Sequence, residues 1–227
     1  MVSLWSGTGS QHKAWEDDGW QIVSCDISPS FDPTFLMDIL ELTPDLIRQR
    51  IGDESPSWIW ASVDCSTFSH CSSVQHYDRY LEPITDKARY MMSRLEHTLN
   101  IIQDLDPLFW IIENPVGKMR ELPVMRQFPR HTVTYCQYEE YHPQKPTDLF
   151  GQVPAGWYPK SCESARWAKE RKCHPRSPRD SRTGTQAKNS VEAGMIPYGL
   201  GRSLVDATHS SNWRRPRTIV DYCSNSS

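Results

Sequence analysis

The chain has 227 residues, with 25 Lys and Arg against 28 Asp and Glu, which gives a formal net charge of −3. This length suits one α/β domain with a small appendage, and no apolar run reaches the eighteen or so residues of a membrane span. The first residues do not form a basic-then-apolar leader, and the seven cysteines lack the spacing of a disulfide scaffold. We therefore expect a soluble, cytoplasmic protein with reduced thiols.

The charge is distributed unevenly along the chain. Residues 158–217 contain 13 basic against 5 acidic side chains, whereas residues 1–157 contain 12 against 22. A basic segment on an acidic body indicates a surface that meets a phosphate backbone. A solvated, partly disordered arm is the alternative, because Pro, Ser and Arg are also typical of flexible tails.

The start of the chain is typical of a nucleotide-binding α/β fold. An apolar run at 2–5 leads into Ser6-Gly7-Thr8-Gly9-Ser10, which predicts a strand, a tight turn and a helix. A second strand over 21–25 ends at Asp26, where a carboxylate can accept hydrogen bonds from ribose hydroxyls. The apolar segment 35–40 repeats the pattern around Asp38. Residues 43–50 predict a short capped helix.

Residues 58–69 contain the candidate nucleophile. A short apolar run ends there in Cys65 and a cluster of small hydroxyl residues. Ligands in open α/β sheets bind outside the carboxyl ends of the strands, so a cysteine just past a buried strand enters that cleft. Free cysteines are more commonly small buried hydrophobes, and a reactive one requires an electropositive setting.

The middle of the chain adds an acid to the same edge. A polar loop over 70–80 precedes a helix over 86–105, and the apolar run 108–112 predicts a buried strand that ends in Glu113-Asn114-Pro115. Strands that alternate with helices favour a parallel sheet, because parallel strands need crossovers. The glycine turn, Asp26, Asp38, Cys65 and Glu113 are therefore expected on one rim.

These residues carry a family resemblance. The ordered motifs are Leu4-Trp5-Ser6-Gly7-Thr8-Gly9, Asp26, Asp38, Cys65-Ser66-Thr67-Phe68-Ser69, Glu113-Asn114-Pro115 and Gly194-Met195-Ile196-Pro197. Together they resemble those of DNA (cytosine-5)-methyltransferases, and more closely the small phage-encoded members. The resemblance implies an α/β, Rossmann-like S-adenosylmethionine-dependent methyltransferase fold, with a mostly parallel sheet and helices on both faces. It also places the protein in the host cytoplasm if it is phage-encoded.

The resemblance implies a role for each motif. Cys65 is the nucleophile and Glu113, followed by Asn114, is the acid beside it; Ser66, Ser69 and Gln137 contact nucleic acid. The methionine part of the cofactor lies on Ser6 to Gly9, its ribose on Asp26 and its adenine amino group on Asp38. The full set of cofactor residues is Trp5, Ser6, Gly7, Thr8, Gly9, Asp26, Ile27, Asp38, Ile39 and Met195.

Three departures from the family pattern stand out. Asp64 occupies the position directly before the nucleophile, where the family has Pro, so it either faces away or slows Cys65 by raising the thiol pKa. The family's Gln-x-Arg-x-Arg stretch is reduced to Gln137 in a run that lacks arginine. Only about forty residues separate Phe150 from the C-terminal motif, where larger members insert a target-recognition domain.

We accordingly expect one methyltransferase domain over 1–227. It has a catalytic core over 1–153, a short basic insert over 154–189 in place of a target-recognition domain, a motif over 190–209 that closes the cofactor pocket, and a polar tail over 210–227. The expected phosphate contacts are Lys160, Arg166, Lys169, Arg171, Lys172, Arg176, Arg179 and Arg182. A structural zinc ion is a further hypothesis, although Cys136, Cys162, Cys173 and His174 match no standard spacing.

The sequence therefore predicts a monomeric enzyme that methylates cytosine at carbon 5 in single-stranded or flipped-base DNA, with low sequence specificity. Two alternatives stay open. RNA is the alternative substrate, because a chain without an obvious duplex-reading domain could act on unpaired bases. A catalytically weak nucleic-acid-binding protein that retains the fold is the other, favoured by Asp64 and the missing arginines.

Overall fold

The computed structural model describes residues 1–52, 55–69, 73–139, 145–162 and 194–211. Its centre is a seven-stranded sheet of order β3-β2-β1-β4-β5-β7-β6. The strands are β1 (Val2–Leu4), β2 (Val23–Asp26), β3 (Phe35–Leu36), β4 (Trp58–Ser62), β5 (Phe109–Pro115), β6 (Arg130–Thr134) and β7 (Pro146–Gln152). Strands β1 to β5 pair in parallel, whereas β7 runs antiparallel to both β5 and β6.

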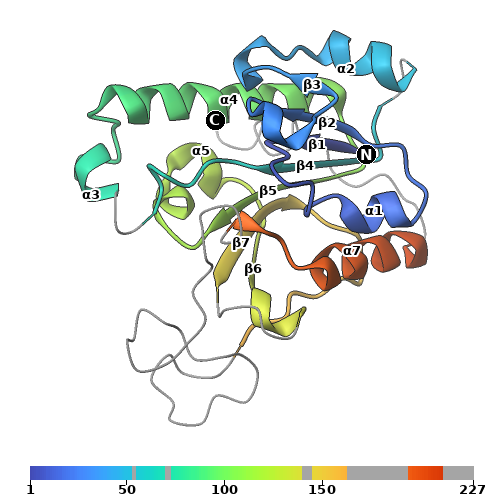
Figure 1. Ribbon diagram of the computed structural model, residues 1–227. Helices are drawn as coiled ribbons and strands as arrows, with labels where there is room; N and C mark the ends of the chain where they lie inside the picture. Colours follow the sequence, from blue (N-terminus) through green and yellow to red (C-terminus); the bar gives the residue numbers. More distant parts are fainter. Residues whose placement is uncertain (53–54, 70–72, 140–144, 163–193, 212–227) are drawn as a thin grey trace.

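Helices cover both faces of this sheet (Figure 1). The longer ones are α1 (Lys13–Asp17), α2 (Pro44–Ile51), α4 (Asp86–Leu105) and α7 (Tyr198–Ser210), and α3 (Ser73–His76) and α5 (Pro123–Arg126) are single turns. Short 3-10 helices occupy Pro29–Phe31, Ile39–Glu41, Lys118–Glu121 and Tyr135–Gln137. The expected mostly parallel sheet with helices on both faces is therefore confirmed.

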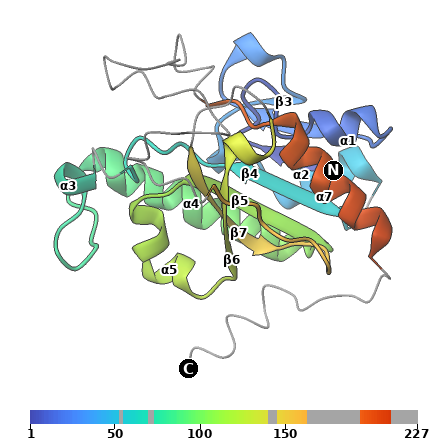
Figure 2. The same cartoon turned by 90° about the horizontal axis from the view of Figure 1, so that it is seen from below.

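The core is divided by the sheet into two layers, because successive strand residues point to opposite faces. Ile59 and Ala61 of β4 pack with α2, α4 and α5, whereas Trp58 and Trp60 pack with α1 and α7. Trp15 of α1 meets both tryptophans edge to face, at centroid distances of 5.2 and 5.9 Å. Figure 2, seen from below, shows α7 and α1 lying together on their face.

Most expected elements are present with shifted ends. The helix over 86–105 has the predicted bounds, and the helix expected over 43–50 covers Pro44–Ile51, with the Thr43 hydroxyl accepting a hydrogen bond from the Leu46 N–H. The strand expected over 108–112 extends to Pro115, because pairing with β7 continues through Glu113 and Asn114.

Two expectations about local structure are wrong. The segment 35–40 is not a buried strand throughout, since β3 ends at Leu36 and the Asp38 carboxylate then caps a 3-10 helix by accepting the Leu40 N–H. The loop expected over 70–80 contains the short helix α3. In the described ranges, no helix combines the length and the apolar character needed to cross a bilayer.

Candidate functional site

The turn after β1 adopts a conformation that few sequences allow. Trp5, Gly7 and Gly9 all have positive φ angles, of 57°, 47° and 78°. A non-glycine residue such as Trp5 rarely occupies this region, and such strain concentrates at functional sites. The side of Gly7 that a Cβ would occupy is open, with nothing within 4 Å, so a ligand can approach the backbone there.

Asp26 fixes this turn from the neighbouring strand. Its Oδ2 accepts the Gly7 N–H at 2.8 Å and its Oδ1 accepts the Ser28 N–H at 2.9 Å. The Ser6 N–H donates to the Cys25 carbonyl at 3.0 Å, which holds the turn against the end of β2. The carboxylate therefore has a defined orientation at the edge where the sequence predicts it.

Two cavities lie along this rim on either side of Trp5. One of about 190 Å³ is bounded by the glycine turn, Phe31 and Ser62. The other, of about 160 Å³, is bounded by Asp26, Ile27, Ile39 and Arg94. Trp5 lines both cavities, and we call the two together the Trp5 trough. The first is bordered by the glycine turn, and the second combines apolar side chains with the charged Asp26, Asp64 and Arg94.

Asp38 reaches the rim but is engaged by α4. Its carboxylate forms an ion pair with Arg94 and accepts a hydrogen bond from the Tyr90 hydroxyl at 2.5 Å. Burial raises the pKa of Asp38, but the hydrogen bonds from Arg94, the Leu40 N–H and Tyr90 outweigh that effect and hold it below the ordinary value. Arg94, which the sequence analysis missed, therefore lines the trough. Its spacing of four residues from Tyr90 places both side chains on one face of the helix, and this spacing could have indicated that they act together.

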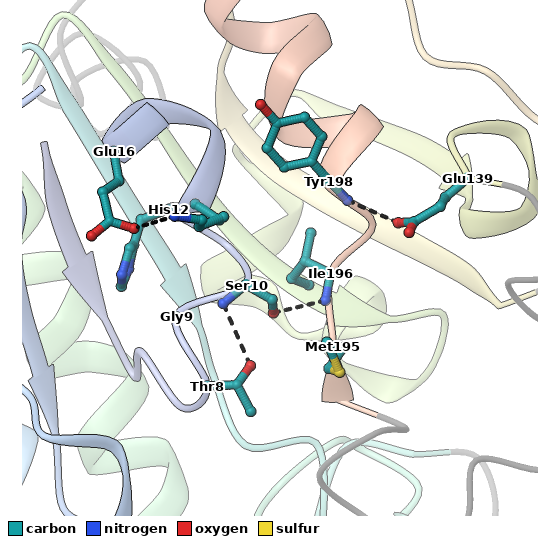
Figure 3. A pocket seen from close by; sticks show the side chains of 10 residues that line it. Thr8, Gly9, Ser10, His12, Glu16, Glu139, Met195, Ile196 and Tyr198 are labelled. Carbon is teal, nitrogen blue, oxygen red and sulfur yellow. Dashed lines mark hydrogen bonds and ion pairs between the residues drawn. The ribbon is translucent and has the colours of Figure 1, made fainter. Parts of the chain in front are cut away.

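The segment before α7 packs against the glycine turn, as Figure 3 shows. The Ile196 N–H donates to the Ser10 hydroxyl at 2.9 Å, and the Tyr198 N–H donates to Glu139 at 3.1 Å. Together with Thr8 and His12, Met195 lines a third cavity of about 310 Å³. The structure thus brings Met195 beside the turn to which the resemblance assigns the methionine part of the cofactor.

The Cys65 loop is tied to β5. Cys65 lies three residues past the end of β4, and its carbonyl accepts both the Phe68 and the Ser69 N–H at 3.0 Å. The Asn114 side chain donates to the Val63 carbonyl at 2.8 Å. At Gly117, a Cβ would lie 2.3 Å from the Phe68 carbonyl oxygen, so this backbone approach requires glycine. Asn114 and Gly117 therefore fix the position of Cys65.

Glu113 is brought to Cys65 by the strand register. It pairs with Ser62, the last residue of β4, and its side chain is only 4% exposed. The Tyr135 hydroxyl donates to Glu113 Oε1 at 2.9 Å. The Lys145 ammonium lies 4.8 Å from the centroid of the Tyr135 ring. Tyr135 and Lys145 are site residues that the sequence analysis missed, because only the fold brings them beside Glu113.

The pKa of the Cys65 thiol reflects both its burial and the charges around it. Burial raises its pKa above the ordinary value; the Lys145 charge opposes this, and the Asp64 and Glu113 charges add to it. The Asp64 carboxylate accepts the Ser66 N–H at 2.7 Å and the Ser66 hydroxyl at 3.1 Å, so it caps the following turn. Asp64 is exposed and acts on Cys65 only through its charge.

This geometry makes a prediction for Asp64. In the Asp64→Asn variant we expect Cys65 to react with iodoacetamide about twofold faster near pH 8, because one negative charge is removed while the cap to Ser66 is retained. The effect is small because an exposed charge is screened. The rate is measured by mass spectrometry of the Cys65 peptide, and a slower reaction would contradict the sign of the effect.

Several predicted contacts lie beyond the trough or outside the described residues. Gln137 and Lys160 are on the β6 side, where the Lys160 ammonium sits 5.6 Å from the Tyr138 ring centroid. Within the described residues, no group of three His, Cys, Asp or Glu side chains could hold a metal ion. The predicted residues outside the described ranges are Arg166, Lys169, Arg171, Lys172, Cys173, His174, Arg176, Arg179 and Arg182.

The fold is the Rossmann-like S-adenosylmethionine-dependent methyltransferase fold, as predicted: a mostly parallel sheet with an antiparallel β7 and loops gathered at one rim. The chain is 30% identical over 169 residues to a "Probable DNA (cytosine-5)-methyltransferase" of Frog virus 3 (isolate Goorha), and the match covers 71% of this chain and 74% of the relative. The chain therefore belongs to the DNA (cytosine-5)-methyltransferase family. No family model matches it.

Solved structures show more distant likeness. Spodoptera frugiperda DNMT2, crystallised as a triple mutant, is 19% identical with a TM-score of 0.44, over 72% of this chain and 53% of that one. The Entamoeba histolytica methyltransferase EhMeth is 12% identical with a TM-score of 0.48, over 73% and 57%. The chain thus spans little more than half the length of these structures.

Proposed function

We propose that this protein transfers a methyl group from S-adenosylmethionine to carbon 5 of cytosine in DNA. The observation that carries the proposal is that Glu113 pairs with Ser62, the last residue of β4, and that Cys65 follows Ser62 by three residues, in a loop to which the Asn114 side chain is hydrogen-bonded. The viral relative, whose name specifies this activity, supports the choice of reaction and of DNA.

The trough beside Trp5 fits the proposed cofactor. Its glycine-bordered end leaves room against the backbone of Gly7, and Asp26 supplies an oriented carboxylate next to it. The apolar side chains of Ile27 and Ile39 flank the other cavity, which suits a flat heteroaromatic ring. Bound there, S-adenosylmethionine would supply an electrophilic methyl carbon.

The chemistry assigned to the protein's own residues begins with Cys65. Its thiolate adds to carbon 6 of the pyrimidine, and the electron pair of the 5,6 double bond moves into the ring. Glu113 hydrogen-bonds ring nitrogen 3 through its acid proton and accepts a hydrogen bond from the exocyclic amine, which stabilises the charge that the addition places on the ring.

The addition would make carbon 5 nucleophilic enough to take the methyl group, and the electron pair of the broken methyl–sulfur bond would stay on the sulfur of the donor. A base then removes the carbon 5 proton, and its electron pair restores the double bond as the Cys65 thiolate leaves. Carbon 6 cannot be reached inside a stacked duplex, so the target base must be unpaired or flipped out.

Binding to DNA is proposed to depend on phosphate contacts rather than on base reading. Sequence readout in the major groove takes several side chains in fixed geometry, and the short 154–189 segment is basic instead. We expect affinity for duplex DNA to fall with salt at a log–log slope of about −0.9 per phosphate neutralised, with little preference beyond the cytosine and one neighbour. Methylation mapping on mixed-sequence DNA tests this; a defined site of four or more base pairs contradicts it.

The experiment that tests the function uses S-adenosylmethionine with an isotope-labelled methyl group and, in separate reactions, DNA or RNA. Digestion and mass spectrometry of the nucleosides identify the product. Labelled 5-methyl-deoxycytidine from DNA is the expected result. Label only in RNA would transfer the proposal to an RNA substrate, and binding to DNA without label in either would favour a binding protein that retains the fold.

A further inference from the structure

In the described part of the chain, Lys145 is a cation whose charge acts on the Cys65 thiol. Strand β7 runs antiparallel to β5 and pairs Thr147 with Pro115. Lys145 therefore lies two residues beyond this pair, on the same rim as Glu113 and Cys65. The Tyr135 N–H donates to the Lys145 carbonyl at 3.3 Å, and the Thr147 hydroxyl donates to the same carbonyl at 3.3 Å. The backbone of Lys145 is thus held at the start of β7.

The side chain of Lys145 is held as well. Its ammonium lies 4.8 Å from the centroid of the Tyr135 ring, within the range in which a cation is attracted to an aromatic face. Tyr135 is itself fixed, because it is 1% exposed and its hydroxyl donates to Glu113. The ring therefore serves as a platform that keeps the positive charge beside the acid and the nucleophile.

Among the residues that the structure describes, the charges that act on Cys65 come from three parts of the chain packed around it. Asp64 belongs to its own loop, Glu113 to β5 and Lys145 to the start of β7. Of these, only Lys145 is positive, and its charge lowers the pKa of the thiol while burial and the two carboxylates raise it. A thiol in a buried, acidic setting needs such a cation to form the thiolate that attacks carbon 6.

We propose that Lys145, seated on the Tyr135 ring, is the residue that stabilises the Cys65 thiolate. Lys145 does not react itself; its positive charge stabilises the negative charge on the Cys65 sulfur. Its importance for methylation rests on the proposed function, whereas its effect on the thiol does not.

The test measures the thiol directly in the full-length protein, without DNA or cofactor. The alkylation rate of Cys65 by iodoacetamide is followed from pH 6 to pH 10 by mass spectrometry of its peptide. In the Lys145→Met variant the rate near pH 8 is expected to fall about tenfold, with the rise of the profile moved to higher pH, because less thiolate is present. The Lys145→Arg variant is expected to restore most of the rate.

Lys160→Met is the matched control, because Lys160 lies over the Tyr138 ring as Lys145 lies over Tyr135. It is expected to leave the Cys65 profile unchanged. A second neutral variant, Lys145→Gln, is measured beside Lys145→Met. The thermal melt of both variants is compared with that of the wild type, so that a change in alkylation rate is not mistaken for misfolding. A wild-type profile in both neutral variants overturns the proposal. A shifted profile in a protein that methylates nothing would leave the inference intact and overturn the proposed function.

Discussion

DNA that contains 5-fluorocytosine is expected to form a covalent complex with the wild-type protein and S-adenosylmethionine, and none with the Cys65→Ala variant. The Cys65 sulfur adds to carbon 6, but fluorine at carbon 5 cannot leave as a proton does, so the sulfur–carbon bond persists. The loss should be complete, because removing the nucleophile removes the bond itself. The complex is measured by denaturing electrophoresis and by mass spectrometry of the attached peptide.

The neighbouring cysteine provides the control for this prediction. Cys71 lies six residues further along the chain, and Cys71→Ala is expected to form the complex as the wild type does. A complex that persists in Cys65→Ala, or a peptide linked through Cys71, would show that the nucleophile is misassigned.

The Asp26→Ala variant is expected to bind S-adenosylmethionine about 10- to 150-fold more weakly. This corresponds to about 1.5–3 kcal/mol, the usual range for hydrogen bonds to a charged group. The Asp26 carboxylate holds the Gly7 N–H in addition to facing the trough, so the variant loses both a proposed ribose contact and the support of the glycine turn. Isothermal titration calorimetry measures the affinity.

Two further variants separate these effects. Asp26→Asn retains an acceptor for the Gly7 N–H and is expected to lose less affinity than Asp26→Ala. Asp45→Ala, which removes an exposed carboxylate of α2 paired with Arg48, is expected to bind as the wild type does. Unchanged affinity in Asp26→Ala would place the ribose contact on another residue.

The fold was largely predictable because its signals are local. Apolar runs of strand length separated by a helical pattern predict the parallel core, and Thr43 and Pro44 mark the start of α2 within the chain itself. The end of β3 was not predictable in this way. Asp38 reads as the end of a strand, but its bonds to Leu40 and to Arg94, 56 residues away, turn the chain at that point.

The candidate site was predictable only where its residues follow strands. Cys65 and Glu113 each stand at the end of an apolar run, and the parallel pairing of β4 and β5 brings them together. Lys145 gives no such signal. No lysine or arginine stands next to Gln137 in the sequence. Lys145 instead reaches the site because the antiparallel pairing of β6 and β7 returns the chain to Tyr135.

The measurement that tests the central claim most directly is the release of tritium from DNA that carries it at carbon 5 of cytosine. If Cys65 adds to carbon 6 and the methyl group replaces the hydrogen at carbon 5, tritium enters the water in step with methyl transfer. The wild type is predicted to release one tritium for each methyl group, and Cys65→Ala to release none. Methyl transfer without tritium release would place the methyl group on another atom and contradict the account.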